Sequence, residues 1–350
     1  MQTQWRLVIL FSLMLLQWTS QAQIGGNDLY EFLMLPNSAR ITALGDHVLT
    51  VKDEEVSFVY QNPALLNPQM HQHISFNQNF HLSGIAFGYA GYGHHVEKWN
   101  ATWHTGIQYI QYGEFQRSDA FGNQEGTFKA AEYAWTIGIG KQLYEKLSVG
   151  VNTRFISSQL ETYQSLGWSA DVGATFQDTA SRFTASLVIR HIGTPISYYT
   201  NARGDGLPTE SQLAIAKRLR YLPLRVGVTY RYLNRWNILY DDPNNREPTS
   251  IFDNLNQPES GSPFVDNLAR HFIFSGEFLF GKNENFRVRA AYNVLRAREM
   301  KVNELRSLGG FSFGFGMKVN RFRIDYGHSV YHLAGGNHHL SLSTSLREFK

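Results

Sequence analysis

Apolar and polar side chains alternate with a period of two through most of the chain after residue 73. In residues 133–140, one face carries Tyr, Trp and two Ile side chains, and the other carries Ala, Thr and two Gly. In residues 311–319, three Phe, one Met and one Val oppose Ser, Lys and two Gly. Because successive residues of a strand point to opposite faces, this period predicts β-strands with one apolar face. No long segment shows the helical period, so the sequence predicts an all-β fold.

The connections between these segments alternate in length. We expect about 14 strands, an even number. Their expected spans are 73–80, 82–93, 98–112, 132–141, 147–159, 165–177, 182–191, 210–219, 223–233, 271–281, 285–296, 310–319, 321–330 and 338–347. The short connections include 142–146, 178–181 and 220–222, and the long ones are 113–131, 192–209, 234–270 and 297–309. Short turns at one end and long loops at the other are typical of outer-membrane barrels, whereas a soluble β-sandwich has no reason to separate them.

The composition favours a barrel whose apolar face meets lipid. Charged residues make up 17% of the chain, below the roughly 25% of soluble proteins, while Phe, Trp and Tyr make up 14%. The mean hydropathy is −0.32, and past the N-terminus no stretch reaches the ~20 apolar residues of a spanning helix. We therefore expect a transmembrane antiparallel β-barrel with a polar lumen. The expected lumen-facing charges are Arg154, Asp171, Arg190, Arg225, Arg231, Glu277, Arg287, Arg289, Arg323 and Asp325.

The first residues of the chain have the pattern of a secretory signal peptide. Arg6 supplies a positive charge, Leu7–Leu16 is an apolar run, and Ser20 and Ala22 are the small residues that a signal peptidase requires. Ten apolar residues are too few to span a bilayer as a helix. We therefore expect residues 1–22 to be removed after Sec-dependent export, and the mature barrel to reach the outer membrane of a Gram-negative cell.

The mature chain divides into two parts. Residues 23–70 lack the alternation, and we expect them to form a hatch or plug in the lumen, with a soluble cap as the alternative. Residues 71–350 carry the alternation and form the expected barrel. Many positions on the polar face of the strands are Gly, Ser or Thr, and such small side chains leave room for a plug.

The residue types argue against several classes of function. A net charge of +3 provides no basic surface for nucleic acid, and the absence of Cys excludes thiolate catalysis and Cys-based zinc sites. The chain has 13 His but no His-Glu-x-x-His motif, and it lacks the Gly-x-Ser-x-Gly elbow of hydrolases. Arg287 and Arg289 beside Glu277 could hold an anionic ligand, but salt bridges along the lumen are the simpler interpretation. We expect no enzyme activity, no catalytic residue, no metal site and no cofactor.

The long loops are the better candidates for a binding role. Residues 234–270 form a connection of about 37 residues, and such a length is usually functional or disordered. Apolar residues in a polar loop suit docking to a protein partner, whereas the alternative is a loop that folds into its own barrel mouth. The candidate partner-binding residues are Ile251, Phe252, Phe264 and Val265 in this loop, and Tyr198, Tyr199 and Arg203 in the loop over 192–209.

Residues 25–68 resemble a known family. The resemblance is carried by Gly26-Asn27-Asp28-Leu29-Tyr30, Phe32-Leu33, Leu35-Pro36, Ser38-Ala39-Arg40, Ala43-Leu44-Gly45 and Asn62-Pro63-Ala64-Leu65-Leu66. This pattern is similar to the PorV/PorQ family of outer-membrane proteins in the type IX secretion system of Bacteroidetes, which are related to FadL-type fatty-acid channels, and its opening is most similar to the PorQ branch. The chain departs from the pattern at Asp46, where a second Gly is expected. Beyond residue 68 the resemblance concerns architecture.

The resemblance implies a FadL-like barrel of fourteen strands with an N-terminal hatch that contains Asn62, Pro63 and Ala64. It implies a non-enzymatic role in the attachment complex that links secreted cargo to lipopolysaccharide. The implied partners are a PorZ-like surface protein, other components of that complex, membrane lipid and lipopolysaccharide. The alternative is a FadL-like transporter of hydrophobic small molecules, which requires an apolar path through the lumen and an opening in the wall.

Overall fold

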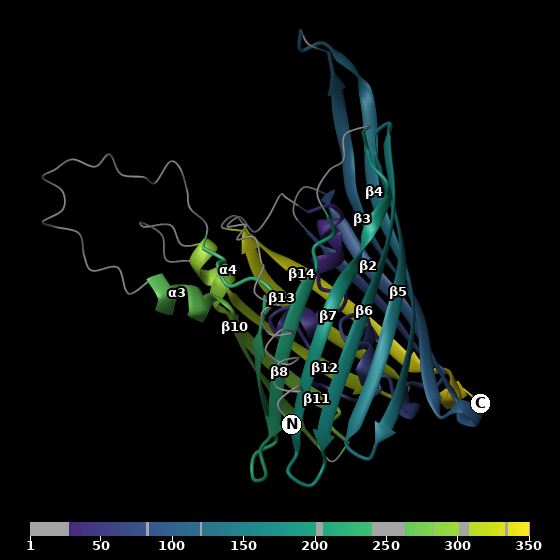
Figure 1. Ribbon diagram of the computed structural model, residues 1–350, viewed down its shortest axis with the longest axis vertical. Helices are drawn as coiled ribbons and strands as arrows, with labels where there is room; N and C mark the ends of the chain where they lie inside the picture. The colour runs from purple at the N-terminus through teal and green to yellow at the C-terminus, as the bar shows by residue number, and fades with distance from the viewer. Residues whose placement is uncertain are drawn as a thin grey trace, which may run out of the picture.

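A computed structural model describes residues 28–81, 84–119, 121–200, 206–239, 263–281, 283–300, 308–332 and 335–349. The predicted signal peptide lies outside the described residues, as do Arg203, Ile251 and Phe252. The chain forms a closed barrel in which each strand pairs antiparallel with the next and β14 pairs with β1. The predicted fold of about fourteen antiparallel strands is therefore confirmed (Figure 1). Closure leaves no unpaired sheet edge, as a structure that spans lipid requires.

The strands differ threefold in length. They are β1 His73–Phe80, β2 Ala86–Val96, β3 Ala101–Ser118, β4 Gln124–Tyr144, β5 Leu147–Leu160, β6 Tyr163–Asp178, β7 Phe183–Ser197, β8 Glu210–Arg218, β9 Leu224–Tyr230, β10 Phe272–Phe280, β11 Phe286–Asn293, β12 Phe311–Val319, β13 Phe322–His332 and β14 Gly335–Ser345. The longest strands, β3 and β4, form a hairpin that rises beyond the rest of the barrel (Figure 1). The shortest, β9, has 7 residues.

The expected long loops contain regular structure, and two of them contain the most. Most of the expected loop over 113–131 is strand instead, because β3 and β4 continue toward the tip, where the Phe115 and Phe128 rings stack with centroids 5.3 Å apart. The expected loop over 234–270 ends in helix α3 (Pro263–Arg270). The expected strand over 285–296 stops at Asn293, whose side chain accepts a hydrogen bond from the Arg296 backbone N–H at 3.2 Å. That cap starts helix α4 (Val294–Glu299).

The two faces of the wall follow the sequence alternation. Outward residues of β4 such as Trp135 are exposed, and inward residues such as Thr136 are buried. Strand β2 is an exception, since Phe87 and Tyr89 point inward and are buried. The ring of Tyr89 meets the ring of Tyr60 edge to face at a centroid distance of 5.6 Å. Inward aromatic residues are therefore used where the lumen is filled by protein. Within the described residues, no helix is long and apolar enough to cross a membrane.

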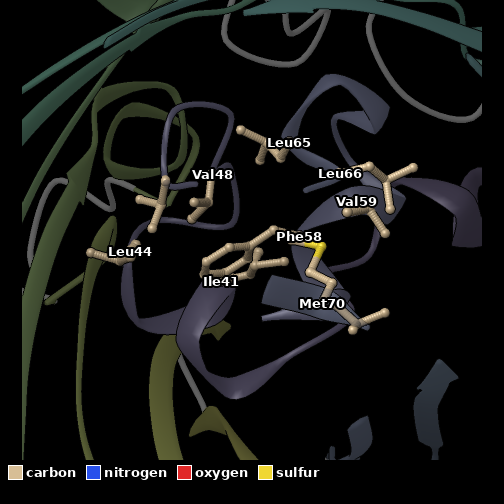
Figure 2. Packing of buried hydrophobic residues seen from close by; sticks show 10 residues of the cluster. Ile41, Leu44, Val48, Phe58, Val59, Leu65, Leu66 and Met70 are labelled. Carbon is tan, nitrogen blue, oxygen red and sulfur yellow. The ribbon is translucent and has the colours of Figure 1, made fainter. Parts of the chain in front are cut away.

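The segment before β1 fills the lumen. It contains the short helices η1 (Glu31–Met34), α2 (Ala39–Ala43), η2 (Val56–Tyr60), η3 (Pro63–Leu65) and η4 (Pro68–Met70). We refer to residues 28–72 as the hatch. Its apolar residues pack on one another and form a core inside the barrel (Figure 2). The members of this core are Ile41, Leu44, Val48, Val51, Val56, Phe58, Val59, Leu65, Leu66 and Met70.

Inward glycines let the hatch backbone touch the barrel wall. A β-carbon placed on Gly150 of β5 would lie 2.3 Å from the Pro63 carbonyl oxygen. One placed on Gly327 of β13 would lie 2.1 Å from the Ala39 carbonyl oxygen. Real β-carbons do not approach oxygen so closely, so these positions admit no side chain while the hatch is in place. The small inward residues of the sequence therefore fit this hatch closely.

Candidate functional site

The Asn62-Pro63-Ala64 motif ties the hatch to itself and to the wall. The buried Asn62 side chain accepts a hydrogen bond from the Ala64 backbone N–H at 3.0 Å, and Pro63 occupies the first turn of η3, where its missing N–H costs nothing. The Asn62 amide nitrogen donates to the Leu49 carbonyl at 2.7 Å and to the Thr175 hydroxyl of β6 at 3.0 Å. The motif thus fixes a hatch turn against β6.

The Ser38-Ala39-Arg40 motif makes a second connection. The Ser38 hydroxyl caps α2 by accepting from the Ile41 backbone N–H at 3.3 Å, and the Ala39 N–H donates to the Ser341 hydroxyl of β14 at 2.8 Å. The Arg40 side chain is 1% exposed and binds Glu277 of β10 through two hydrogen bonds of 2.9 and 3.0 Å. A bidentate pair of this kind is the strongest ordinary contact between a guanidinium and a carboxylate.

Around Glu277 the charges form a compact network, which we call the hatch lock. Besides Arg40, the Glu277 carboxylate accepts from Arg225 and from Arg289, each at 2.8 Å. On the hatch side, Asp53 binds Arg40 at 2.6 Å. The members of the hatch lock are Arg40, Asp53, Arg225, Glu277 and Arg289. Its three guanidiniums converge on one buried carboxylate, which is why charged residues are tolerated at this depth.

The lock extends to further charges. Arg289 also binds Asp325 at 2.6 Å, and Arg287 approaches Asp53 at 3.5 Å. Burial alone would raise the pKa of the Asp53 carboxyl, but the nearby guanidiniums, led by Arg40, outweigh burial and hold that pKa below its ordinary value. At the rim, Arg323 binds Glu54 of the hatch at 2.9 Å. The sequence does not distinguish Asp53 or Glu54 from their neighbours, because the hatch has no periodic pattern that would show which of its residues face the wall.

A second group of charges supports the other side of the hatch. Arg154 binds Asp171 at 2.5 Å and donates to the Tyr60 carbonyl at 2.5 Å, with its guanidinium 4.2 Å from the centre of the Tyr60 ring. Nearby, Arg231 binds Glu210 through two hydrogen bonds of 2.7 and 3.1 Å. All the lumen-facing charges expected from the sequence therefore point inward, and most of them serve the hatch directly or brace the residues that do.

At the end of the barrel with the long loops, the hatch leaves an open cavity of about 420 Å³, which we call the loop-end bowl. Guanidiniums of its wall lie over aromatic rings, with Arg231 4.5 Å from the centre of Tyr232 and Arg296 4.0 Å from the centre of Tyr331. Arg296 also forms an ion pair with Asp46 of the hatch. The apolar lining consists of Met34, Leu35, Pro36, Pro208, Leu295 and Met300.

Burial and charge affect the titrating groups of the bowl. Burial raises the pKa of the Glu299 carboxyl, although Arg231 opposes the shift. Burial, together with Arg231 and Arg190, holds the pKa of His47 well below its ordinary value of 6.5. The His47 ring is therefore neutral at physiological pH.

Below the bowl the lumen narrows sharply. A cavity of about 20 Å³ adjoins the bowl at His47 and is lined by Val48, Thr50 and Glu277 among others. That volume holds about one water molecule. At Thr50 it adjoins a polar recess of about 270 Å³ at the short-turn end, which includes Lys52. At this narrow point between the bowl and the recess, the described residues leave room for about one water molecule and are too close together for a hydrocarbon to pass.

The candidate loop residues fall into two groups. Tyr198 and Tyr199 are half-buried at the barrel mouth, where the Tyr199 hydroxyl lies 2.5 Å from the Ser158 hydroxyl of β5. Phe264 and Val265 of α3 instead point outward and are 61% and 60% exposed. The structure thus separates residues that close the mouth from residues that offer an apolar surface. No group of three or more His, Asp or Glu that could hold a metal ion occurs within the described residues.

Comparisons with solved structures identify the fold. The chain is similar to the CymD monoaromatic hydrocarbon channel with a TM-score of 0.50 and 13% identity, over 89% of this chain and 96% of CymD. It is similar to the Ralstonia pickettii toluene transporter TbuX (TM-score 0.49, 11% identity, 90% of this chain and 99% of TbuX). A Pseudomonas aeruginosa FadL homologue gives a TM-score of 0.47 at 9% identity, over 89% and 99% of the two chains.

Neither a family model nor a curated protein sequence matches the chain. At identities near 10%, likeness between structures concerns the fold alone. The fold of this chain is a closed antiparallel transmembrane barrel of the FadL-like type.

Proposed function

We propose that this protein is a plugged barrel of the outer membrane that anchors a partner on the cell surface, as a component of the type IX secretion system. The partner would be a PorZ-like protein of the complex that attaches secreted cargo to lipopolysaccharide. The observation that carries the proposal is the position of the family-like motifs. Arg40 and Asn62, which belong to those motifs, are the residues that fasten the hatch to the wall.

Two further features support an anchor. The hatch is held by the buried ion pair of Arg40 with Glu277 and by the rim pair of Glu54 with the buried Arg323, so its removal would leave buried charges without these partners. The cavity below the bowl holds about one water molecule. A membrane anchor for a surface protein needs a stable barrel and a mouth that binds, and it needs no passage through the lumen.

A second candidate is uptake of small hydrophobic molecules. The solved structures with this fold include a hydrocarbon channel and a toluene transporter, so the comparisons favour this candidate over the anchor. The loop-end bowl, with Met34, Leu35 and Leu295 in its lining, could receive a small apolar molecule. Passage onward would then require the hatch or the wall to move.

A reversible cross-link between hatch and wall distinguishes the two candidates. The Ser57 hydroxyl of the hatch lies 2.7 Å from the Ser75 hydroxyl of β1, and the chain contains no Cys. The Ser57→Cys/Ser75→Cys variant can therefore be locked by oxidation and released by reduction. It is introduced into a strain that lacks the native protein, and surface attachment of secreted cargo is measured beside uptake of a labelled aromatic hydrocarbon.

If the protein is an anchor, deletion abolishes cargo attachment, and the oxidised variant restores it as fully as the reduced one. If the protein is a transporter whose hatch moves, deletion abolishes uptake and leaves attachment intact, and only the reduced variant restores uptake. The single variants Ser57→Cys and Ser75→Cys are the controls, because they alter the same positions without forming the bond. Unchanged attachment in the deletion strain would overturn the anchor.

A further inference from the structure

The barrel wall is lowest on one side. Strands β8 to β12 are consecutive in the wall and have 9, 7, 9, 8 and 9 residues, whereas β3 and β4 have 18 and 21. Strand β1 has 8 residues, but it lies alone between β2 and β14, which have 11 each. A tilted strand needs about 9–11 residues to cross the hydrocarbon core of a bilayer. The strands on the low side are therefore barely long enough, and β9 and β11 fall below this length. Some other part of the chain must complete the surface that faces lipid there.

Helix α3 stands at the loop end of this low wall. Its last residue is followed by His271 and then by β10, and the helix projects outward beside the barrel (Figure 1). The exposed Phe264 and Val265 lie on it. In the segment that follows β9, Leu233 and Trp236 are also largely exposed. These four residues, Leu233, Trp236, Phe264 and Val265, form what we call the lateral apolar patch.

The lateral apolar patch is continuous with the lipid-facing aromatic residues of the barrel. The Phe264 ring lies 5.2 Å from the ring of Trp236, which lies 5.7 Å from that of His271. The His271 ring stacks on Tyr230 at 4.7 Å, and Tyr230 meets Phe272 at 5.2 Å. Phe272 in turn stacks on Phe274, an outward residue of β10. A series of ring contacts, which passes through the buried ring of His271, therefore leads from the lipid-facing wall to α3.

The orientation of α3 is fixed by its polar side. The buried Asn267 donates from its amide nitrogen to the Trp236 carbonyl at 2.6 Å and accepts from the Ile238 N–H at 3.0 Å. Asp266 binds Arg270 at 2.8 Å and Arg298 of α4 at 3.2 Å. These contacts hold the helix against the segment after β9, so Phe264 and Val265 remain on the outer side. The Arg298 side chain is 47% exposed and remains accessible to a lipid phosphate, whereas the Arg270 side chain is 15% exposed.

We propose that α3 is an interfacial helix, and that the lateral apolar patch is embedded in the outer leaflet of the membrane above the low wall. The occupant of this surface is lipid, with acyl chains against Phe264 and Val265 and anionic headgroups near Arg298. The sequence pattern suggested that the same two apolar residues dock a protein. Continuity with the lipid-facing row of rings favours lipid. The proposal depends on the barrel and is independent of whether the protein is an anchor or a transporter.

Spin-label accessibility tests this proposal. The chain contains no Cys, so Phe264→Cys carries a nitroxide at a single position. The labelled protein is placed in nanodiscs of phosphatidylethanolamine and phosphatidylglycerol, and collision rates with oxygen, which concentrates in lipid, and with a water-soluble nickel chelate are measured. Phe274→Cys, on the outer face of β10, is the lipid reference. Phe121→Cys is the water reference, because Phe121 lies at the tip of the β3–β4 hairpin and its native side chain is 92% exposed.

We expect the label at residue 264 to collide with oxygen more than with nickel, as at residue 274, and the reverse at residue 121. Val265→Cys should behave like Phe264→Cys, which guards against a local effect of one substitution. Accessibility at 264 and 265 equal to that at 121 would overturn the proposal. So would nickel access that is lost only when a surface protein is added, because that result identifies a protein as the occupant. Both native side chains are exposed, so neither substitution removes a buried contact.

Discussion

Substitution of Glu277 by Gln is the sharpest perturbation of the hatch. The amide keeps the shape of the side chain and removes the one carboxylate on which three guanidiniums converge. Two of these, Arg225 and Arg289, belong to the barrel and keep their neighbours whether or not the hatch is seated. Only Arg40 belongs to the hatch. The substitution therefore weakens the contact that seats the hatch more than the contacts that close the barrel.

The magnitude follows from burial. Breaking a buried ion pair by neutralising one partner costs about 3–5 kcal/mol, and the lower value applies here because Arg40 keeps Asp53 at 2.6 Å. About 3 kcal/mol corresponds to a roughly 150-fold increase in the equilibrium constant for hatch opening. Native-state hydrogen exchange in nanodiscs measures this increase at the backbone amides of α2, such as the Thr42 N–H that donates to the Ser38 carbonyl. Barrel amides should keep their wild-type protection.

A surface ion pair provides the matched control. Glu161 binds Arg117 on the outer part of the barrel, where the two side chains are 29% and 43% exposed. Glu161→Gln should change hatch exchange by less than a factor of about 5, because exposed pairs contribute no more than about 1 kcal/mol. The reasoning is refuted if the amides of α2 in Glu277→Gln exchange at the same rate as in Glu161→Gln.

Three further substitutions test the hatch and the bowl. In Gly150→Val the new β-carbon would meet the Pro63 carbonyl, so the hatch should become sensitive to protease while the barrel keeps its heat-modifiable migration. Gly276→Val is the control, because no atom lies closer than 3.9 Å to its β-carbon, and its hatch should stay protected. Because the pKa of His47 is lowered in the folded state, the unfolded state binds the proton first, and the wild-type free energy of unfolding falls as pH drops below 6.5. In His47→Asn this fall should be smaller by up to about 1.4 kcal/mol per pH unit, as measured by thermal or urea unfolding. Asp46→Asn, which suits the positive φ of 73° but breaks the ion pair with α4, should raise hydrogen exchange in α4 and leave the strands unchanged.

The barrel could be predicted from the sequence because the alternation of apolar and polar residues can be recognised within each strand separately. A strand with lipid on one side and a polar lumen on the other needs alternation at every step, so residues such as Trp135 and Thr136 show their faces without reference to the rest of the chain. The register of neighbouring strands and the position of Arg154 opposite Ser169 follow once the faces and turns are known. The same locality explains the errors at strand ends, where β3 and β4 continue through polar residues that carry no apolar face.

The hatch contacts could not be predicted in the same way. Arg40 and Glu277 are separated by 237 positions, and no periodic pattern relates them. The motif at Asn62 identified a conserved-looking turn by resemblance, but its contact with Thr175 appears only when the barrel is closed around it. Helix α3 was missed for another reason. It has eight residues, too few for a helical period to stand out within a long polar connection.

The backbone conformation and the ion pair of Asp46 together explain the residue found at this position. The pattern that residues 25–68 resemble leads us to expect Gly at this position, and the φ of 73° is consistent with it, since residues other than Gly rarely adopt a left-handed conformation. An Asp tolerates that conformation better than most residues, and its carboxylate gains the ion pair with Arg296 of α4. Arg298, one half-turn further along α4, binds Asp266 of α3. Two ion pairs, one at Arg296 and one at Arg298, therefore connect α4 to the hatch and to the helix that we place at the membrane surface. The residue at which the chain departs from the pattern is therefore the one that pairs the hatch with α4.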